Sequence, residues 1–454
     1  MRDILIIGAG PAGMSAAITL AKHGACPVVI SDAPDAGGQG YRKLNPHIDL
    51  DPRQIYGPEY HRYESLNRQF SELLHIIDYR PSTLAWAIYG GKAHVLRDGQ
   101  ASEIPYRGLI LAPGATDRIM PVPGWTLPGV FSLGAAQIAL KDQGCFIGRN
   151  VVFAGSSPLL LLAALQYRRL GATDLAVLDT TGFSRKLLAL AGMRHAPRTF
   201  AQGLSYMREL KALGVPVRTG IELKEIEGRN RVSAIRFAAA SGKEHRIGCD
   251  AVALGHGLRS ETQLAELAGC SFSFDPALRQ WFPKSDENGR AGERLYVTGD
   301  GAGIGGAEAA VAGGSLAAIA LLEELGTPVK PGEKSGLQSK VSRLRRFQKS
   351  LARAFNWPHE QAATLPDDVI VCRCENVTAG DIRKAAGDDL GPVEVNRMKA
   401  ITRCGMGRCQ GRFCGPALAE ITAAAAGQPI ETVGRLRAQA PVKPLPLSAA
   451  RSEP

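Results

Sequence analysis

Residues 4–13 read ILIIGAGPAG, which is a run of four apolar residues followed by a G-x-G-x-x-G turn. A helical run from Met14 to His23 follows directly. A buried strand, a glycine-rich turn and a helix in this order form the fingerprint of a dinucleotide-binding fold. An ordinary glycine turn, the alternative, requires neither the strand nor the helix. The stretch therefore predicts that the chain begins with a dinucleotide-binding domain.

Each glycine of this turn has its own expected role. Gly8 permits the tight turn, Gly10 lets the backbone approach a diphosphate, and Gly13 allows the helix to pack on the strand. Pro11 and Ala12 lie between the last two glycines, at the helix N-terminus on which the diphosphate is expected to sit. All five are candidate cofactor-binding residues.

An acid follows at the distance that the fingerprint requires. A second predicted strand, from Pro27 to Ser31, ends at Asp32, roughly twenty residues after the turn. Asp32 is placed to accept hydrogen bonds from a ribose. NAD and FAD share this fingerprint, so the turn and the acid leave open which of them binds.

Composition limits the class of protein. With 454 residues and 45% apolar residues, the chain is long enough for two or three domains, and 52 glycines favour an α/β fold. The charge of +11 comes from scattered Lys and Arg, which suits anionic cofactors and an acidic partner surface, not nucleic acid. Met1 to Ile7 already read as a core strand and not as a signal peptide, and no apolar stretch is long enough for a transmembrane span. We expect a cytoplasmic protein.

The segment from Leu109 to Ala115 is a strand running into a turn. It resembles the second FAD motif of the flavoproteins that have two dinucleotide-binding domains, the glutathione-reductase-like class. The resemblance implies that Ala112 and Gly114 lie at the cofactor. Pro113 stands in place of the usual threonine, which weakens the expectation of a side-chain contact there.

The segment from Leu295 to Gly301 resembles the third FAD motif of the same class, in which an acid binds the ribityl chain. The resemblance gives this role to Asp300, with Gly301 beside it. It also resolves the choice of dinucleotide, since it implies FAD in the first domain.

A glycine pair after the second strand resembles the flavin-side loop of this class. The loop contains Gly38, Gln39 and Arg42, which the resemblance places at the flavin. A surface glycine turn is the alternative, because glycine pairs commonly mark turns.

A second nucleotide-type fold is predicted to begin near residue 150. A buried strand, Val151 to Gly155, precedes a helix, Leu159 to Leu170, but Ser157 and Leu160 stand where the second and third glycines belong. A side chain at either position obstructs the approach of a diphosphate or the packing of the helix on the strand. We therefore do not expect this domain to bind NAD. It also lacks the C-x-x-C of a dithiol relay.

Five of the nine cysteines fall between Cys372 and Cys414. Two close groups, C-R-C at 372–374 and C-G-M-G-R-C-Q-G-R-F-C at 404–414, are separated by about thirty residues, so they can converge on one metal site. Four thiolates suit either zinc or a [2Fe-2S] cluster. Zinc is redox-inert, so a cluster is the more natural companion for a flavin.

The cysteine segment resembles the bacterioferritin-associated-ferredoxin-like (BFD-like) [2Fe-2S] domain. On that resemblance the cluster ligands are Cys372, Cys374, Cys409 and Cys414. Cys404 occupies the variable position of the pattern but is spaced from Cys409 as Cys409 is from Cys414, so it stays open as a ligand.

A linker helix precedes this domain. From Lys334 to Phe355 it carries seven basic residues and no acid, and its apolar residues recur at three- and four-residue steps. They are Val341, Leu344, Phe347, Leu351 and Phe355. We expect this face to dock within the protein, with peripheral contact to a membrane as the alternative.

We expect six segments in all. They are an FAD-binding domain in two parts (1–116 and 288–330), a second Rossmann-like domain (117–287), the linker (331–365), the BFD-like domain (366–430) and a Pro-rich extended tail (431–454).

Taken over nearly its whole length, the chain resembles the alpha subunit of two-component amine dehydrogenases: opine oxidases, D-hydroxyproline and L-proline dehydrogenases, and hydrogen cyanide synthase. Besides the cofactor motifs, the resemblance rests on PVPGW at 121–125, LPGV at 127–130 and GIGGAE at 303–308. It implies that a beta subunit with its own flavin oxidises the C–N bond and that this chain passes the electrons onward.

No set of catalytic residues is evident in the sequence. His256 in a G-H-G turn is an isolated candidate for a general base, but nothing in the sequence supplies an orienting partner, and a structural role is the alternative. We therefore expect a subunit whose function is electron transfer. The alternative function is that of a self-sufficient NAD(P)H-dependent or amine-oxidising flavoprotein.

Overall fold

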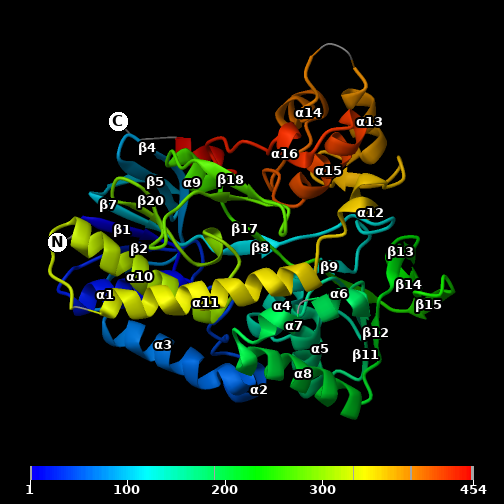
Figure 1. The fold of residues 1–454 in the computed structure, drawn as a ribbon, viewed down its shortest axis with the longest axis horizontal. Helices are drawn as coiled ribbons and strands as arrows, with labels where there is room; N and C mark the ends of the chain where they lie inside the picture. Colours follow the sequence, from blue (N-terminus) through cyan, green and yellow to red (C-terminus); the bar gives the residue numbers. More distant parts are fainter. Residues whose placement is uncertain (1–2, 189, 331, 389–390, 451–454) are drawn as a thin grey trace.

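The computed structural model of the chain describes residues 3–188, 190–330, 332–388 and 391–450. Figure 1 shows two units built on β-sheets, one at the left and one at the lower right, with a small helical module in orange and red above the second. A long helix lies across both units.

The first sheet has the strand order β20-β21-β7-β1-β2-β3. Its strands are β1 (Ile4–Ile7), β2 (Val28–Ile30), β3 (Asp78–Arg80), β7 (Gly108–Leu111), β20 (Arg290–Gly292) and β21 (Leu295–Val297). All neighbours pair in parallel except β20 with β21. The carboxyl ends of β1, β2, β7 and β21 therefore meet at one edge, and each is followed by one of the predicted cofactor segments.

Every residue of β1 is buried because both faces of the sheet are covered. Ile4 and Ile6 belong to the core formed with α1 (Pro11–Lys22) and α10 (Ala307–Glu324). Leu5 and Ile7 belong to a second core on the opposite face. That face is covered by the antiparallel sheet of β4 (Thr83–Tyr89), β5 (Lys92–Arg97) and β6 (Gln100–Pro105). The helices α2 (Pro52–Tyr56) and α3 (Tyr60–Glu72) complete the domain.

Helices α1 and α10 approach each other unusually closely. A Cβ on Gly314 would lie 2.0 Å from the carbonyl oxygen of Ala12, so no larger residue fits between the helices. The hydroxyls of Ser15 and Ser315 share a hydrogen bond of 2.8 Å at the same contact. This packing holds the glycine turn before α1 and the third FAD motif before α10 in a fixed relation.

The second sheet has the order β12-β11-β10-β16-β9 and is parallel throughout. Its strands are β9 (Val130–Ser132), β10 (Asn150–Gly155), β11 (Asp174–Asp179), β12 (Val217–Thr219) and β16 (Ala251–Gly255). The helices around it are α4 (Leu133–Lys141), α5 (Leu159–Arg169), α6 (Phe183–Leu188), α7 (Leu190–Met193) and α8 (Pro197–Ala212). The antiparallel strands β13 (Glu222–Gly228), β14 (Val232–Ala238) and β15 (Glu244–Gly248) form a separate sheet.

The chain crosses between the two domains along a pair of antiparallel strands, β8 (Ala115–Asp117) and β17 (Leu258–Ser260). After the return crossing, α9 (Gln263–Leu267) packs in the core of the first domain. β18 (Phe272–Asp275) and β19 (Gln280–Pro283) follow. The return therefore comes near residue 258, earlier than the position 287 expected from the sequence.

The linker helix α11 (Glu333–Ala354) docks inside the protein, as expected. Val341 packs against Leu316 of α10, while Phe347 lies in a core with Met193 of α7. Leu351 and Phe355 are partly buried beside Phe347. Among the described residues, no helix is both long and apolar enough to traverse a bilayer.

The C-terminal module consists of α12 (His359–Ala363), β22 (Ile370–Cys372), β23 (Val377–Thr378), α13 (Ala379–Ala386), α14 (Val395–Thr402), α15 (Gly415–Ala426) and α16 (Ile430–Val433). It shares one hydrophobic core with the second domain. At this junction the indole N–H of Trp125 donates to the carbonyl of Ile370 at 2.6 Å. The tail then returns across the first domain, partly extended, and its described part includes a short 3-10 turn (Leu447–Ala450).

Candidate functional site

The glycine turn after β1 has the geometry that its sequence requires. A Cβ on Gly8, where φ is +106°, would lie 2.2 Å from the carbonyl oxygen of Ala112, and one on Gly13 would lie 1.8 Å from that of Gly8. A Cβ on Gly10, in contrast, would meet only the Cα of Gly38, at 3.8 Å. The first and third glycines are therefore needed for backbone packing, and the second leaves room for a diphosphate at the N-terminus of α1.

The loop predicted to lie on the flavin side folds over this turn. The amide of Gly37 donates to the carbonyl of Ala9 at 2.8 Å. Gln39 is exposed, whereas Arg42 is half-buried and its Nε has no partner among the described residues. A buried donor without an acceptor fits a site that a ligand completes.

The acid of the third motif lies after β21. Asp300 accepts backbone hydrogen bonds from Gly305 at 2.8 Å and Gly306 at 3.0 Å, both on Oδ1. Burial raises the pKa of Asp300, while the two amides oppose this shift. These two hydrogen bonds fix the carboxylate of Asp300 next to the buried Gly301. Both amides bind Oδ1, and neither binds Oδ2.

The second nucleotide-type turn keeps only its first glycine. Gly155 has φ +144° and approaches the carbonyl of Gly255, but the hydroxyl of Ser157 accepts from the amide of Leu159 at 3.2 Å. The acid that ends β11, Asp179, forms a 2.7 Å ion pair with Lys186. The amide of Leu159 and the carboxylate of Asp179, which a dinucleotide would need here, are therefore engaged within the protein.

All five clustered cysteines meet in the C-terminal module. The sulfurs of Cys372, Cys404 and Cys414 lie within 4.8 Å of one another. Cys409 in turn accepts hydrogen bonds from the thiols of Cys414 and Cys374. Cys374 is exposed, whereas Cys372, Cys404 and Cys414 are buried, so one side of the cluster of thiols faces solvent.

Backbone amides support the thiolates. Gly405 (φ +96°) and Gly411 (φ +77°) direct their N–H groups to Cys372 and Cys409. Hydrogen bonds from neighbouring thiols are the largest cause that lowers the pKa of Cys372 to about 2 and of Cys409 to about 5. This donor set suits a [2Fe-2S] cluster, whose sulfur ligands are deprotonated and hydrogen-bonded by amides.

A short segment that runs from the end of β17 to the start of α9 joins the two cofactor regions. On one side, the amide of Glu261 donates to the carbonyl of Gly114 at 3.0 Å, and the hydroxyl of Ser260 donates to the carbonyl of Asp300. On the other side, Arg259 donates to the carbonyls of Gly411 and Arg412 at 2.9 and 3.1 Å. Residues 259–263 are called the bridge segment below.

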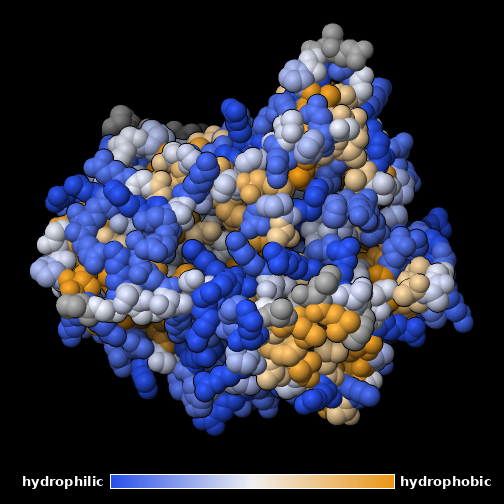
Figure 2. All heavy atoms as spheres, viewed as in Figure 1, coloured by the Kyte–Doolittle hydropathy of each residue, from blue (hydrophilic) through white to orange (hydrophobic). Residues whose placement is uncertain are grey.

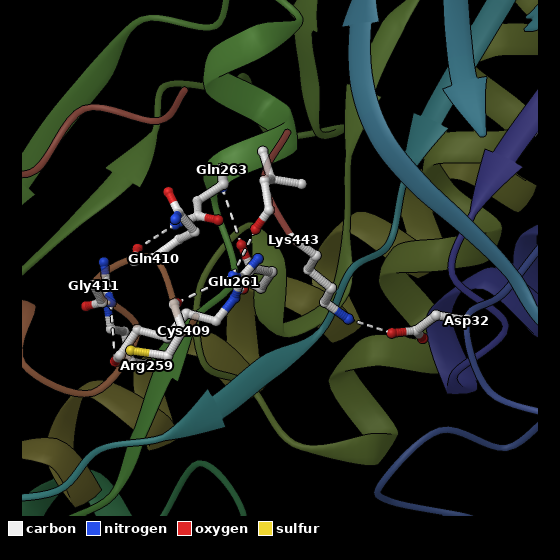
Figure 3. Close-up of polar contacts among 10 residues, drawn as sticks. Asp32, Arg259, Glu261, Gln263, Cys409, Gln410, Gly411 and Lys443 are labelled. Atoms are coloured by element: carbon white, nitrogen blue, oxygen red, sulfur yellow. Dashed lines mark hydrogen bonds and ion pairs between the residues drawn. The ribbon is translucent and has the colours of Figure 1, made fainter. Parts of the chain in front are cut away.

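Figure 3 shows further contacts between the bridge segment and the cysteine loop. The side-chain amide of Gln263 donates to the carbonyl of Gln410 at 2.7 Å. Glu261 forms a 2.5 Å ion pair with Arg412. Arg412 also donates to the carbonyl of Cys409 at 3.2 Å. The bridge segment thus contacts the second and third FAD motifs and the cysteine loop at once.

Sequence reasoning did not identify Arg259, Glu261, Gln263 or Arg412 as site residues. They follow no fingerprint, and their partners lie about 150 positions away in the chain. Two features of the sequence could have indicated these residues. The bridge segment lies where the chain returns to the first domain, and Arg412 lies within the cysteine motif.

His256 does not have the surroundings of a general base. It is only 2% exposed, and its Nδ1 accepts from the amide of Met120 at 3.4 Å. Burial, with a contribution from Arg118, lowers the pKa of His256 to about 3. The imidazole ring is therefore neutral and shielded from solvent, which fits a structural role for His256 instead of a role as general base.

The sequence matches two families. Residues 2–326 match the family described as pyridine nucleotide-disulphide oxidoreductase, and residues 370–424 match the BFD-like [2Fe-2S] binding domain. Together with the fold, these matches define an FAD-containing oxidoreductase that carries a [2Fe-2S] module, and they confirm the predicted fold class and both predicted cofactors.

Full-length relatives narrow this class. An opine oxidase subunit of Agrobacterium tumefaciens is 36% identical over 98% of this chain and 90% of that protein. Hydrogen cyanide synthase subunit HcnB of Pseudomonas protegens is 32% identical over 98% of this chain and 96% of that protein. The chain belongs to the family of these two subunits. L-proline dehydrogenase from P. horikoshii has the same fold, with a TM-score of 0.71 at 19% identity, over 99% of this chain and 79% of that one.

Proposed function

We propose that the chain is the electron-transfer subunit of a heteromeric dehydrogenase. A partner beta subunit with its own flavin oxidises a secondary amine or an amino acid of the opine, hydroxyproline, proline or glycine type. This chain receives the electrons and passes them to an acceptor. Its relatives in opine oxidase and hydrogen cyanide synthase are named as subunits, which supports an assembly of this kind.

The bridge segment is the observation that carries the proposal. FAD accepts electrons in pairs or singly, and a [2Fe-2S] cluster transfers them one at a time. Ser260 and Glu261 contact the carbonyls of Asp300 and Gly114, while Arg259 contacts the cysteine loop. The chain thus holds its two cofactor regions against each other through a segment of five residues, an arrangement suited to electron transfer within one polypeptide.

The second domain supports electron entry from a partner instead of from NAD(P)H. The amide of Leu159, the first residue of α5, donates to the hydroxyl of Ser157 where a diphosphate would bind. Asp179, the acid in the ribose position, has one oxygen on Lys186 and the other on the amide of Thr181, and its side chain is only 8% exposed. A pyridine nucleotide would have to displace these contacts.

An exposed apolar surface supports the presence of a partner. Figure 2 shows an orange area on the lower right of the molecule, where Figure 1 places α6–α8. Leu187, Leu190, Leu204 and Met207 of these helices are all between 39% and 48% exposed. Apolar surfaces of this kind commonly mark protein–protein contacts. We assign this one to the partner subunit.

Purification of the native complex tests the proposal. We expect a second subunit to elute with the chain, and the complex to contain more flavin than one FAD per copy of this chain. A flavin-free partner, or elution of the chain alone from its native source, would contradict the assignment.

Anaerobic stopped-flow absorbance of the isolated chain separates the proposal from its alternative. We expect neither NAD(P)H nor an amino acid to bleach the flavin without the partner subunit. Rapid bleaching by NAD(P)H or by an amine would instead identify a self-sufficient flavoprotein.

A further inference from the structure

The C-terminal tail is anchored to α9 of the first domain and to α14 of the cysteine module before it reaches β4. The guanidinium of Arg435 pairs with Glu266 of α9 at 2.5 Å, and the same carboxylate accepts from the amide of Ala438 at 2.8 Å. The amide of Arg437 donates to the side chain of Asn396 in α14 at 2.9 Å. The tail therefore leaves the cysteine module along a defined path.

Val442 fixes the end of this path. Its side chain is 3% exposed and lies in the core that also contains Leu5 and Ile7 of β1. Its amide donates to the carbonyl of Trp86 at 3.0 Å, and its carbonyl accepts from Arg412 at 2.8 Å. One residue of the tail is thus held by the first domain and by the cysteine loop together.

The next residue, Lys443, meets the predicted ribose-binding acid. Its ammonium donates to the carboxylate of Asp32 at the end of β2, as Figure 3 shows. The two side chains are 41% and 54% exposed, and ion pairs with such exposure contribute little to stability. The anchors at Val442, and not the ion pair, therefore account for the position of the ammonium.

The contact leaves both groups able to bind more. A carboxylate has about four lone-pair sites, so Asp32 can accept from ribose hydroxyls and from Lys443 together. An ammonium has three N–H donors and a positive charge, which suits an anionic dinucleotide.

We propose that Lys443 is an FAD-binding residue, supplied by the C-terminal tail to the adenosine-ribose end of the site in the first domain. The proposal rests on the assignment of Asp32 to the ribose of FAD. Because Val442 is tied to Arg412, bound FAD also holds the tail against the cysteine module.

FAD affinity tests this proposal directly. Titration of apoprotein with FAD, followed by flavin fluorescence, should give a dissociation constant about 3- to 10-fold weaker for Lys443→Ala, the effect of losing one charge-assisted hydrogen bond. Lys443→Arg should retain most of the affinity. Arg437→Ala removes an exposed cation from the same tail and should leave the affinity unchanged. An unchanged or tighter dissociation constant for Lys443→Ala would overturn the proposal.

Hydrogen exchange supplies a readout that does not depend on affinity. Amides of residues 435–446 should exchange more slowly in the FAD-loaded protein than in the apoprotein, and this difference should shrink in Lys443→Ala. Equal exchange with and without FAD would contradict a tail that belongs to the site. Asp32→Asn separates the role of Lys443 from the assignment of Asp32 to the ribose. If Asp32→Asn leaves the FAD affinity unchanged, the ribose assignment is wrong. If Asp32→Asn weakens FAD binding and Lys443→Ala does not, the ribose assignment holds and only the role of the tail is wrong.

Discussion

Gly407 lies so close to Cys374 that a Cβ on the glycine would stand 2.2 Å from the Cβ of the cysteine. No side chain fits this contact without moving the C-R-C segment. We predict that Gly407→Ala loses most of the cluster absorbance while far-UV circular dichroism and FAD content stay unchanged. Gly387→Ala is the matched control, since its added Cβ meets only ordinary contacts at 3.7 Å. A fully loaded Gly407→Ala protein would show that Cys374 is not a ligand or that the loop yields easily.

The five clustered thiols make the ligand set testable one residue at a time. We predict that Cys372→Ser, Cys374→Ser, Cys409→Ser and Cys414→Ser each abolish the cluster but not FAD, and that Cys404→Ser retains the cluster. Cys404 is buried beside Cys372, and its hydrogen bond to Cys372 is the largest cause that raises the pKa of Cys404. A raised pKa suits a thiol that stays protonated next to the cluster instead of binding iron. Iron and sulfide content and the electron paramagnetic resonance of the reduced protein measure the result. Loss in Cys404→Ser with retention in Cys374→Ser would reverse the assignment.

Arg259 should control electron transfer between the two cofactor regions. It donates to two carbonyls of the cysteine loop, so Arg259→Met removes both of these hydrogen bonds and loosens the loop from the bridge segment. We expect both cofactors to stay bound and flavin-to-cluster transfer after photoreduction to slow about tenfold, which corresponds to about 1.4 kcal/mol in the barrier. Arg246→Met, at an exposed ion pair on β15, is the control. An unchanged rate would place the electron path elsewhere.

The contact between α1 and α10 should be sensitive to one methyl group. Gly314→Ala places a Cβ 2.0 Å from the carbonyl oxygen of Ala12, so the helices must separate. We predict a loss of about 1–3 kcal/mol in the free energy of unfolding, seen as a lower melting temperature. Gly336→Ala, in α11 with no atom within 4 Å of the added Cβ, should be neutral or slightly stabilising. Equal melting temperatures for the two variants would contradict the close packing.

Lys141 in α4 predicts a pH dependence of stability. The side chain is 3% exposed, and burial, with repulsion from Arg42, lowers the pKa of Lys141 to about 8. Between pH 8 and 10.5, the Lys141 amine is more protonated in the unfolded chain than in the folded protein, so the free energy of unfolding rises with pH across this window. Below pH 8 the amine is charged in both states, and the folded protein bears the full cost of burying the charge.

Lys141→Met removes this cost. Near pH 7 it should be more stable than the wild type, by at most about 3 kcal/mol, since the contacts of the ammonium with Gln137 and the Tyr56 ring are also lost. The advantage should decline as the pH approaches 10.5. Urea denaturation at several pH values measures the difference, with exposed Lys211→Met as control. A stability difference that does not change with pH would contradict the buried, depressed pKa.

Local patterns in the sequence predicted much of the fold. The roles of Gly8 and Gly13 follow from a turn of a few residues, and the structure places both glycines against backbone carbonyls. The apolar face of α11 was visible for the same reason, since helical spacing is a local property. The cysteine motif likewise identified the residues that meet in the C-terminal module.

Contacts between distant segments could not be derived in this way. Lys443 and Asp32 are 411 positions apart, and Arg259 and Gly411 are 152 apart. Neither pair has a spacing or periodicity that indicates contact, because each depends on how the tail and the module pack on the first domain. The return crossing near Leu258 was missed for a similar reason, as no change in composition marks it.

One feature of α11 bears on the timing of turnover. Val341 packs on α10 of the first domain, and Phe347, six residues later on the same helix, packs against α7 of the second. Rotation of one domain relative to the other would have to pull one of these side chains out of its core. We therefore expect the two domains to keep a fixed relative position during turnover. Electron transfer should then not be limited by the microsecond-to-millisecond hinge motions that govern many two-domain proteins.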